Sequence, residues 1–204
     1  MRLKNLITLS DVVNVVFVAA LCATFYVLSL RWNKPILDGN GFRQTQTAIS
    51  AFWMARNWNF FNYQTPVLGF PWSIPFELPV YELVVAVFSR ILPTDLDQTG
   101  RVVSLLFFLG CYWPLMYIFN RIGLNRDQGK LIFSIALLSP IYLFMNSTFL
   151  IESTALFLSI CFISSVISFS DSPSIWRFFL MTFFAVLAAT VKITRFVPFS
   201  IDAA

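Results

Sequence analysis

Long apolar stretches without ionisable residues in their interiors are the feature that most constrains how this sequence can fold. Five stretches qualify as membrane spans: 12–30, 102–119, 131–151, 154–170 and 176–191. Each approaches the ~20 apolar residues that a helix needs to cross the hydrocarbon core of a bilayer. Charged residues make up only 12% of the chain, so water is a poor solvent for its surface. The sequence therefore predicts an all-α, polytopic transmembrane bundle of about five spans, forming one domain over residues 1–204.

A long segment, 31–101, separates the first two apolar stretches, and we interpret it as an external loop with two helices lying at the membrane surface. Residues 45–58 have helical spacing, and the side predicted to be apolar consists of Ala48, Ile49, Phe52 and Trp53. Residues 79–92 are too few for a span, and they carry Pro79 at the first position and Glu82 in the first turn. Several prolines between the two segments exclude long regular structure there.

The topology depends on whether residues 79–92 cross the membrane. If they do not, the segment 31–101 and the turn near Glu152 lie outside, while loops 120–130 and 171–175 lie in the cytoplasm with the N-terminus. The basic residues on the inner side are then Arg2, Lys4, Arg121, Arg126, Lys130 and Arg177. This distribution follows the positive-inside tendency, in which long loops count little.

Acidic residues are scarce, so their positions are informative. Asp38 lies beyond the first apolar stretch, near Arg43 and Gln44. A turn residue ahead of a surface helix is one interpretation of Asp38. The other is a carboxylate held at the membrane surface beside a cation and an amide, a combination that suits the handling of hydroxyls and phosphate.

A second acidic residue, Glu152, is isolated between two apolar stretches. It either helps to start the following helix or marks a site, because an isolated carboxylate at a membrane boundary is costly to keep dry. Glu77 leaves the same two interpretations open. Lys192 and Arg195 follow the last stretch, where they serve either as snorkelling anchors or as phosphate contacts.

Three segments resemble a known family: LDGNGFRQTQTAISAFWMARN, FELPVYELVVAVFSRIL and GRVVSLLFFLGCYWPLMYIFNRIG. They are similar to the amino-terminal part of GT-C membrane glycosyltransferases, in particular the bacterial relatives of protein O-mannosyltransferases and aminoarabinose transferases. Those enzymes keep an acidic residue in the first external loop, followed by surface helices, and another in an external loop after the third span. Asp38 matches the first position and Glu152 the second. Where a His-Pro-Pro or Lys-Pro element is common in the family, this sequence has Glu77-Leu78-Pro79.

The resemblance implies inverting transfer of a sugar from a polyprenyl-phosphate carrier to an acceptor hydroxyl at the non-cytoplasmic face. Asp38 would deprotonate or orient the acceptor, and Glu152 would help to shape the acceptor or sugar site. Cations, Arg43 first, would stabilise the leaving phosphate. The residues implied in substrate binding are Arg43, Gln44, Glu77, Lys192 and Arg195.

The implied partners are a polyprenyl-phosphate-linked sugar, membrane lipids and an acceptor glycan, lipid or protein, in a bacterial inner membrane with the site facing the periplasm or exterior. We expect no nucleic-acid partner. The chain has no His, the commonest metal ligand, so we expect no protein metal site, while a divalent cation remains open as a cofactor.

Members of the family have further spans and a carboxy-terminal region, whereas this sequence ends soon after the fifth stretch. We therefore expect that a carboxy-terminal half is missing and that the chain is inactive alone. Two alternatives stay open. One is a non-catalytic membrane remnant or scaffold, and the other is a transporter, which the absence of charge inside the spans disfavours.

Overall fold

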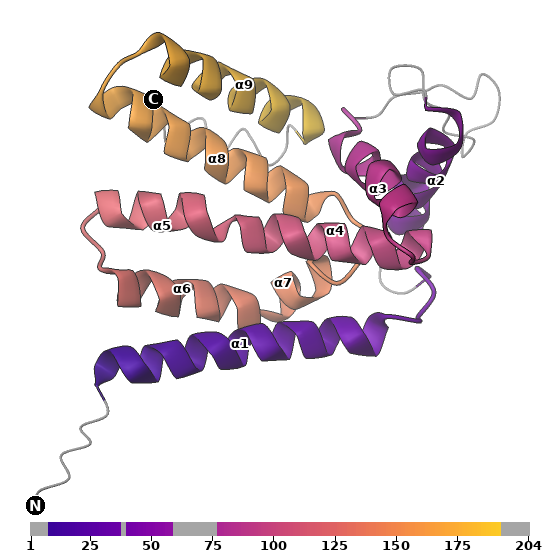
Figure 1. The fold of residues 1–204 in the computed structure, drawn as a ribbon, viewed down its shortest axis with the longest axis horizontal. Helices are drawn as coiled ribbons and strands as arrows, with labels where there is room; N and C mark the ends of the chain where they lie inside the picture. Colours follow the sequence, from indigo (N-terminus) through magenta and orange to yellow (C-terminus); the bar gives the residue numbers. More distant parts are fainter. Residues whose placement is uncertain (1–7, 38–39, 59–76, 193–204) are drawn as a thin grey trace, which may run out of the picture.

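The computed structural model of the chain describes residues 8–37, 40–58 and 77–192. Every regular element in these ranges is an α-helix, which confirms the all-α prediction for this part of the chain (Figure 1). The helices are α1 (Leu9–Arg31), α2 (Gly41–Asn57), α3 (Val80–Ile91), α4 (Leu96–Gly110), α5 (Tyr112–Arg121), α6 (Arg126–Leu138), α7 (Pro140–Met145), α8 (Glu152–Asp171) and α9 (Ile175–Val191).

Within the described ranges, three helical stretches are long and apolar enough to cross a membrane: Leu9–Arg31, Leu96–Arg121 and Glu152–Asp171. The second joins α4 to α5 through Cys111, whose carbonyl accepts a hydrogen bond from Leu115 N at 3.1 Å. Helix α9 is apolar but has only 17 residues. Many large apolar side chains are exposed on these helices, a surface that suits lipid better than water. These features support the prediction of a transmembrane protein.

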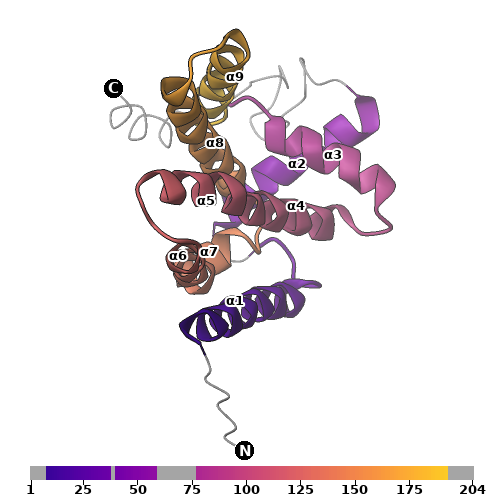
Figure 2. The ribbon, with the colours of Figure 1, turned by 60° about the vertical axis from the view of Figure 1, so that its left-hand side comes forward.

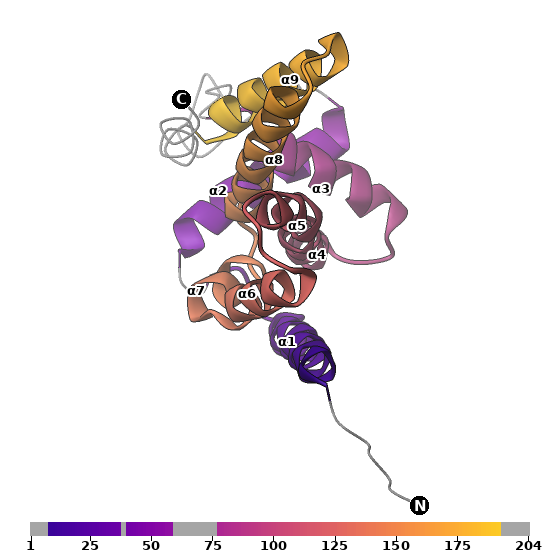
Figure 3. The same cartoon turned by 90° about the vertical axis from the view of Figure 1, so that its left-hand side faces the viewer.

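The helices α1, α6, α5, α8 and α9 follow one another from bottom to top when the bundle is seen nearly end-on (Figure 3). In chain order, α1, α4–α5, α6–α7, α8 and α9 run alternately in opposite directions, so their connections alternate between two ends of the bundle (Figure 1). Helices α2 and α3 pack against each other and against α4 at one end (Figure 2). We call this end the α2–α3 end.

The placement of the connections follows the grouping expected from the sequence. The turn before Glu152 and the C-terminus of α9 lie at the α2–α3 end, whereas the α5–α6 and α8–α9 connections lie at the other end with the start of α1 (Figure 1). The second end carries Arg121, Arg126, Lys130 and Arg177, and we call it the basic end. Which end faces the cytoplasm stays a prediction.

The stretch 131–151, expected as one span, is divided in the structure. Helix α6 ends at Leu138, Ser139 has extended backbone at φ −63° and ψ 128°, and α7 begins with Pro140 at its first position. Proline has no backbone N–H and disfavours helical geometry in the residue before it, so Ser139 leaves the helix. Residues 146–151 then form turns, without a regular helix, up to α8.

The two helices of the segment 31–101 lie close to their expected positions. Buried Ala48 and Ala51 face α3, where they pack in one cluster with Tyr81 and Val85. Phe52, predicted on the apolar side, is exposed. Small side chains let two helix backbones approach closely. In α3, Pro79 precedes the first helical residue, and Glu82 lies in the first turn as predicted.

Candidate functional site

A buried polar network at the α2–α3 end connects α3, α4 and the turn before α8. Tyr81 Oη donates a hydrogen bond to Gly100 O at 2.8 Å and lies 3.0 Å from Ser104 Oγ. Ser104 Oγ in turn donates to Thr148 O at 2.7 Å. Burial raises the pKa of the Tyr81 phenol, so its proton stays available for donation at neutral pH. The network fixes three segments far apart in sequence relative to one another.

The turn before α8 is held by a second contact, from α2. Gln44 is fully buried, and its Oε1 accepts a hydrogen bond from Phe149 N at 3.1 Å. The Phe149 ring packs edge-on against Tyr81, with 5.6 Å between centroids, and directly over Gly100. These contacts determine where Glu152, the first residue of α8, is placed.

Glu152 forms an ion pair with Lys192, the residue after α9. Lys192 Nζ lies 2.5 Å from Glu152 Oε1, and the two side chains are only 16% and 17% exposed. The other carboxylate oxygen, Oε2, is buried with no hydrogen-bond partner in the described part of the chain. The same holds for Asn146 Nδ2, Ser153 Oγ and Thr154 Oγ1. Buried polar atoms in this state are rare in proteins, which makes the start of α8 the strongest candidate for contact with a ligand.

A second, more exposed ion pair lies between α2 and the segment before α3. Arg43 Nη2 is 3.5 Å from the Glu77 carboxylate, and the side chains are 42% and 30% exposed. Arg43 Nη1 also donates to Gln46 Oε1 at 3.4 Å. Exposed pairs at such distances contribute little stability, so Arg43 can exchange its partner for an anionic ligand at small cost.

The two ion pairs are linked through the backbone. Leu78, next to Glu77, donates its N–H to Thr190 O at 3.0 Å, two residues before Lys192. Val80 packs into the cluster formed by Ala155 of α8 and Val191 of α9. Two carboxylates and two cations from four distant segments therefore meet at the α2–α3 end.

Glu82, in the first turn of α3, adds an acid to this region. Burial, helped by the negative charge of Glu77, raises the pKa of Glu82 from its ordinary 4.5 to about 8, although a backbone hydrogen bond and the Arg43 charge oppose the rise. A carboxyl that keeps its proton near neutral pH can give or accept a proton during a reaction. The sequence predicted Glu82 only as a charged residue in the first turn of a helix. Nothing in the local pattern indicates that its carboxyl is buried.

The structure brings together most of the residues predicted for the site. Arg43, Gln44, Glu77, Glu152 and Lys192 all lie at the α2–α3 end. Gln44 differs from the others because it is buried and bonded to backbone. Asp38 and Arg195 lie outside the described residues. Tyr81, Ser104 and Asn146 were not predicted, and no spacing in the sequence marks them.

Within the described ranges, no three Cys, Asp or Glu residues lie close enough together to hold a metal ion. Comparison of the chain with family models, curated proteins and solved structures finds no match.

Proposed function

We propose that the chain takes part in transferring a sugar from a polyprenyl-phosphate-linked donor to an acceptor hydroxyl at the non-cytoplasmic face of a bacterial inner membrane. The observation that carries the proposal is the meeting of two ion pairs, Arg43–Glu77 and Glu152–Lys192, with unpartnered buried polar atoms at the start of α8. The order of elements, a long apolar helix, two short helices and further apolar helices, also agrees with the arrangement that the GT-C resemblance implies.

The reaction needs a base for the acceptor and positive charge for the leaving group. The acceptor oxygen attacks the anomeric carbon, the bond from that carbon to the phosphate oxygen breaks, and the phosphate leaves with the electron pair. Asp38, the base implied by the resemblance, takes the acceptor proton. Lys192 and Arg43 stabilise the charge on the phosphate, because fixed cations are most effective where charge develops.

The proposal gives Glu152 two roles, one for each carboxylate oxygen. Its Oε1 holds the Lys192 ammonium in place, and its Oε2 accepts a hydrogen bond from a hydroxyl of the acceptor or sugar. Loss of Glu152 then frees Lys192 without removing the positive charge. Loss of Lys192 removes the charge and leaves a partly buried carboxylate unpaired, which is strongly unfavourable.

The membrane topology belongs to the same proposal. We propose five crossings, with α6 and α7 crossing together as a broken helix, α9 as a short span, and α2 and α3 at the outer surface. The basic end then faces the cytoplasm, as the positive-inside tendency requires.

The test measures donor binding with the full chain in nanodiscs, and sugar transfer from a labelled polyprenyl-phosphate hexose in membranes of cells in which each variant replaces the native chain. We expect Lys192→Gln to weaken donor binding, and Glu152→Gln to retain binding but lose transfer. Asp38→Asn should retain binding and lower transfer by ~10²–10⁴-fold, the usual contribution of a positioned base. Asp127→Asn at the basic end is the matched control for loss of a carboxylate.

Donor binding that is equal in the native chain and Lys192→Gln would contradict the phosphate site. Binding without transfer in any sample, with no effect of Asp38→Asn, would favour the scaffold interpretation over the enzyme.

A further inference from the structure

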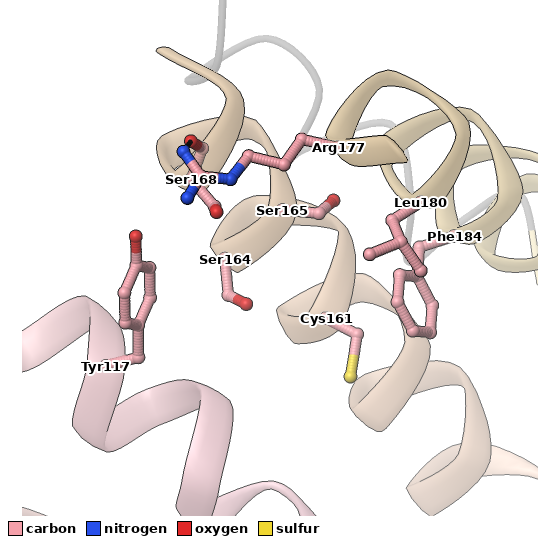
Figure 4. Close-up of a pocket in the computed structure, with 8 residues that line it drawn as sticks. All are labelled: Tyr117, Cys161, Ser164, Ser165, Ser168, Arg177, Leu180 and Phe184. Carbon is pink, nitrogen blue, oxygen red and sulfur yellow. Dashed lines mark hydrogen bonds between the residues drawn. The ribbon is translucent and has the colours of Figure 1, made fainter. Parts of the chain in front are cut away.

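A cavity of about 270 Å³ lies between α5, α8 and α9 near the basic end, away from the candidate site (Figure 4). Its polar lining comes from Tyr117 of α5, from Ser164, Ser165 and Ser168 of α8, and from Arg177 of α9. Its apolar lining comes from Cys161 of α8, and from Leu180 and Phe184 of α9. Binding there would be independent of the chemistry proposed at the α2–α3 end.

The lining changes from apolar to polar along the helices. On α8, Cys161 is closer to the middle of the helix, while Ser168 lies near its end at Asp171, about 10 Å further along at the usual rise per residue. On α9, Arg177 is close to the first residue and Phe184 lies in the middle. In a membrane, this gradient runs from the headgroup region toward the hydrocarbon core.

The polar side of the cavity carries the positive charge of Arg177, which no carboxylate of the described residues pairs with. Asp171, beside the cavity, forms an ion pair with Arg121 and accepts a hydrogen bond from Tyr117 Oη at 3.1 Å. Arg177 has no ion-pair partner among the described residues; its Nη1 donates to Ser168 O at 3.1 Å and Ser172 O at 2.8 Å. These bonds cap the end of α8 and fix the guanidinium at the cavity, where its other donors remain for a ligand.

Hydroxyl groups next to the guanidinium are also available. Ser164 and Ser168 are four residues apart, so they lie on one face of α8 (Figure 4). Neither hydroxyl has a hydrogen-bond partner in the described part of the chain, whereas Ser165 Oγ donates to Phe162 O at 2.6 Å. A fixed cation, two neighbouring hydroxyls and an apolar floor form a site for an anionic amphiphile.

We propose that this cavity binds the headgroup of an anionic phospholipid, with Arg177 on the phosphate, the Ser164 and Ser168 hydroxyls on the glycerol oxygens, and Phe184 against the start of an acyl chain. Arginine suits this role because its planar donors match the geometry of phosphate oxygens. Anionic phospholipids differ from zwitterionic ones by their net charge, so the unneutralised guanidinium also selects between them.

The experiment measures binding of short-chain phosphatidylglycerol to the full chain, purified in a neutral detergent. Parallel titrations use short-chain phosphatidylcholine and inorganic phosphate. We expect saturable binding of phosphatidylglycerol only, and at least about tenfold weaker binding in Arg177→Gln, since hydrogen bonds to charged groups are the strong ones. Arg126→Gln, which removes an exposed charge at the same end outside the cavity, should bind like the native chain.

Ser164→Leu provides a second variant because Arg177→Gln also removes a helix cap. The leucine fills part of the cavity without changing charge, and we expect it to weaken lipid binding while circular dichroism shows unchanged helix content. Equal binding of phosphatidylcholine, or an equal loss in Arg126→Gln, would overturn the proposal. Native-like lipid binding in Ser164→Leu would also overturn it. Competition by inorganic phosphate would overturn the lipid assignment and assign the site to free phosphate.

Discussion

The two ends of the bundle are held by different kinds of contact. At the α2–α3 end, buried hydrogen bonds join segments far apart in sequence, such as Tyr81 with Ser104 and Gln44 with the Phe149 backbone. At the basic end, the side-chain contacts between helices are more exposed, such as the Arg121–Asp171 ion pair and the Lys130–Asn14 hydrogen bond, and the helix ends carry local caps. Asn125 caps α6 in a reciprocal pair with Gln128, and the Ser174 side chain caps α9.

The difference shows what each end can do. Buried polar contacts between distant segments hold side chains in one geometry, which is what a site for group transfer needs. Exposed contacts and local caps contribute less to stability, because solvent competes for their partners. Substitutions should therefore be more damaging at the α2–α3 end than at the basic end.

The largest effect is expected for Gly100→Ala in α4. A Cβ at this position would overlap the ring of Phe149, which is packed between α4 and α3. Overpacking of this kind typically costs about 1–3 kcal/mol, and here it also displaces the turn before Glu152. Thermal unfolding in detergent measures the effect as a lower midpoint.

Gly41→Ala is the matched control for Gly100→Ala. Gly41 is the first residue of α2, and among the described residues a Cβ there meets only Ile36 O, at an ordinary 3.5 Å. Its midpoint should stay near the native value. A similar fall of the unfolding midpoint in the two variants would show that overlap with the Phe149 ring is not the cause of the destabilisation.

A smaller effect is expected for Asn125→Ala at the basic end. Asn125 Oδ1 accepts a hydrogen bond from Gln128 N at 2.9 Å, and Gln128 Oε1 accepts from Asn125 N at 2.9 Å. Loss of such a cap costs about 1 kcal/mol. Asn125→Asp keeps the acceptor and should be nearly native. If Asn125→Ala lowered the unfolding midpoint more than Gly100→Ala, the contrast between the ends would be wrong.

The smallest effect is expected from Glu82→Gln, because Glu82 is only half-buried and solvent therefore reduces the effect of its charge. Burial raises the pKa of Glu82 from 4.5 to about 8, so the folded state keeps a proton that the unfolded state loses between these values. The free energy of unfolding therefore falls as pH rises from about 4.5 to about 8 and then levels off.

The measurement for Glu82 is the unfolding midpoint across this pH range. Glu82→Gln should remove part of the decline, and Glu82→Asp should keep a titrating group. An unchanged slope in Glu82→Gln would mean that other groups cause the pH dependence.

The sequence was most informative where a pattern is local. Apolar runs predicted the helices of the bundle, and helical spacing with prolines predicted α2 and α3 to within a few residues. The break at Ser139 was missed because Pro140 is also tolerated inside spans, as Pro114 in α5 shows. Only the contacts of the neighbouring helices decide which outcome occurs.

The partners of the site residues could not be predicted, because they depend on tertiary packing. Glu152 and Lys192 are 40 residues apart, and Arg43 and Glu77 are 34 apart. Sequence reasoning selected these residues for their charge and scarcity, and it left their pairing open. The same limit applies to Tyr81, whose hydroxyl gains its importance only from Ser104 on another helix.

Arg101 carries a consequence for the biosynthesis of the chain. Its buried guanidinium donates to the carbonyl oxygens of Arg31 at 2.6 Å and Trp32 at 3.0 Å, and to Lys34 O at 2.5 Å, at the end of α1. Arg31, Trp32 and Lys34 precede Arg101 by about seventy residues. In a nascent chain shorter than 101 residues, their carbonyl groups therefore lack the hydrogen bonds from the Arg101 guanidinium. The segment between α1 and α4 therefore closes into a loop only after the ribosome has passed residue 101. Assembly of the α2–α3 end is a late event, although α2 itself is translated early.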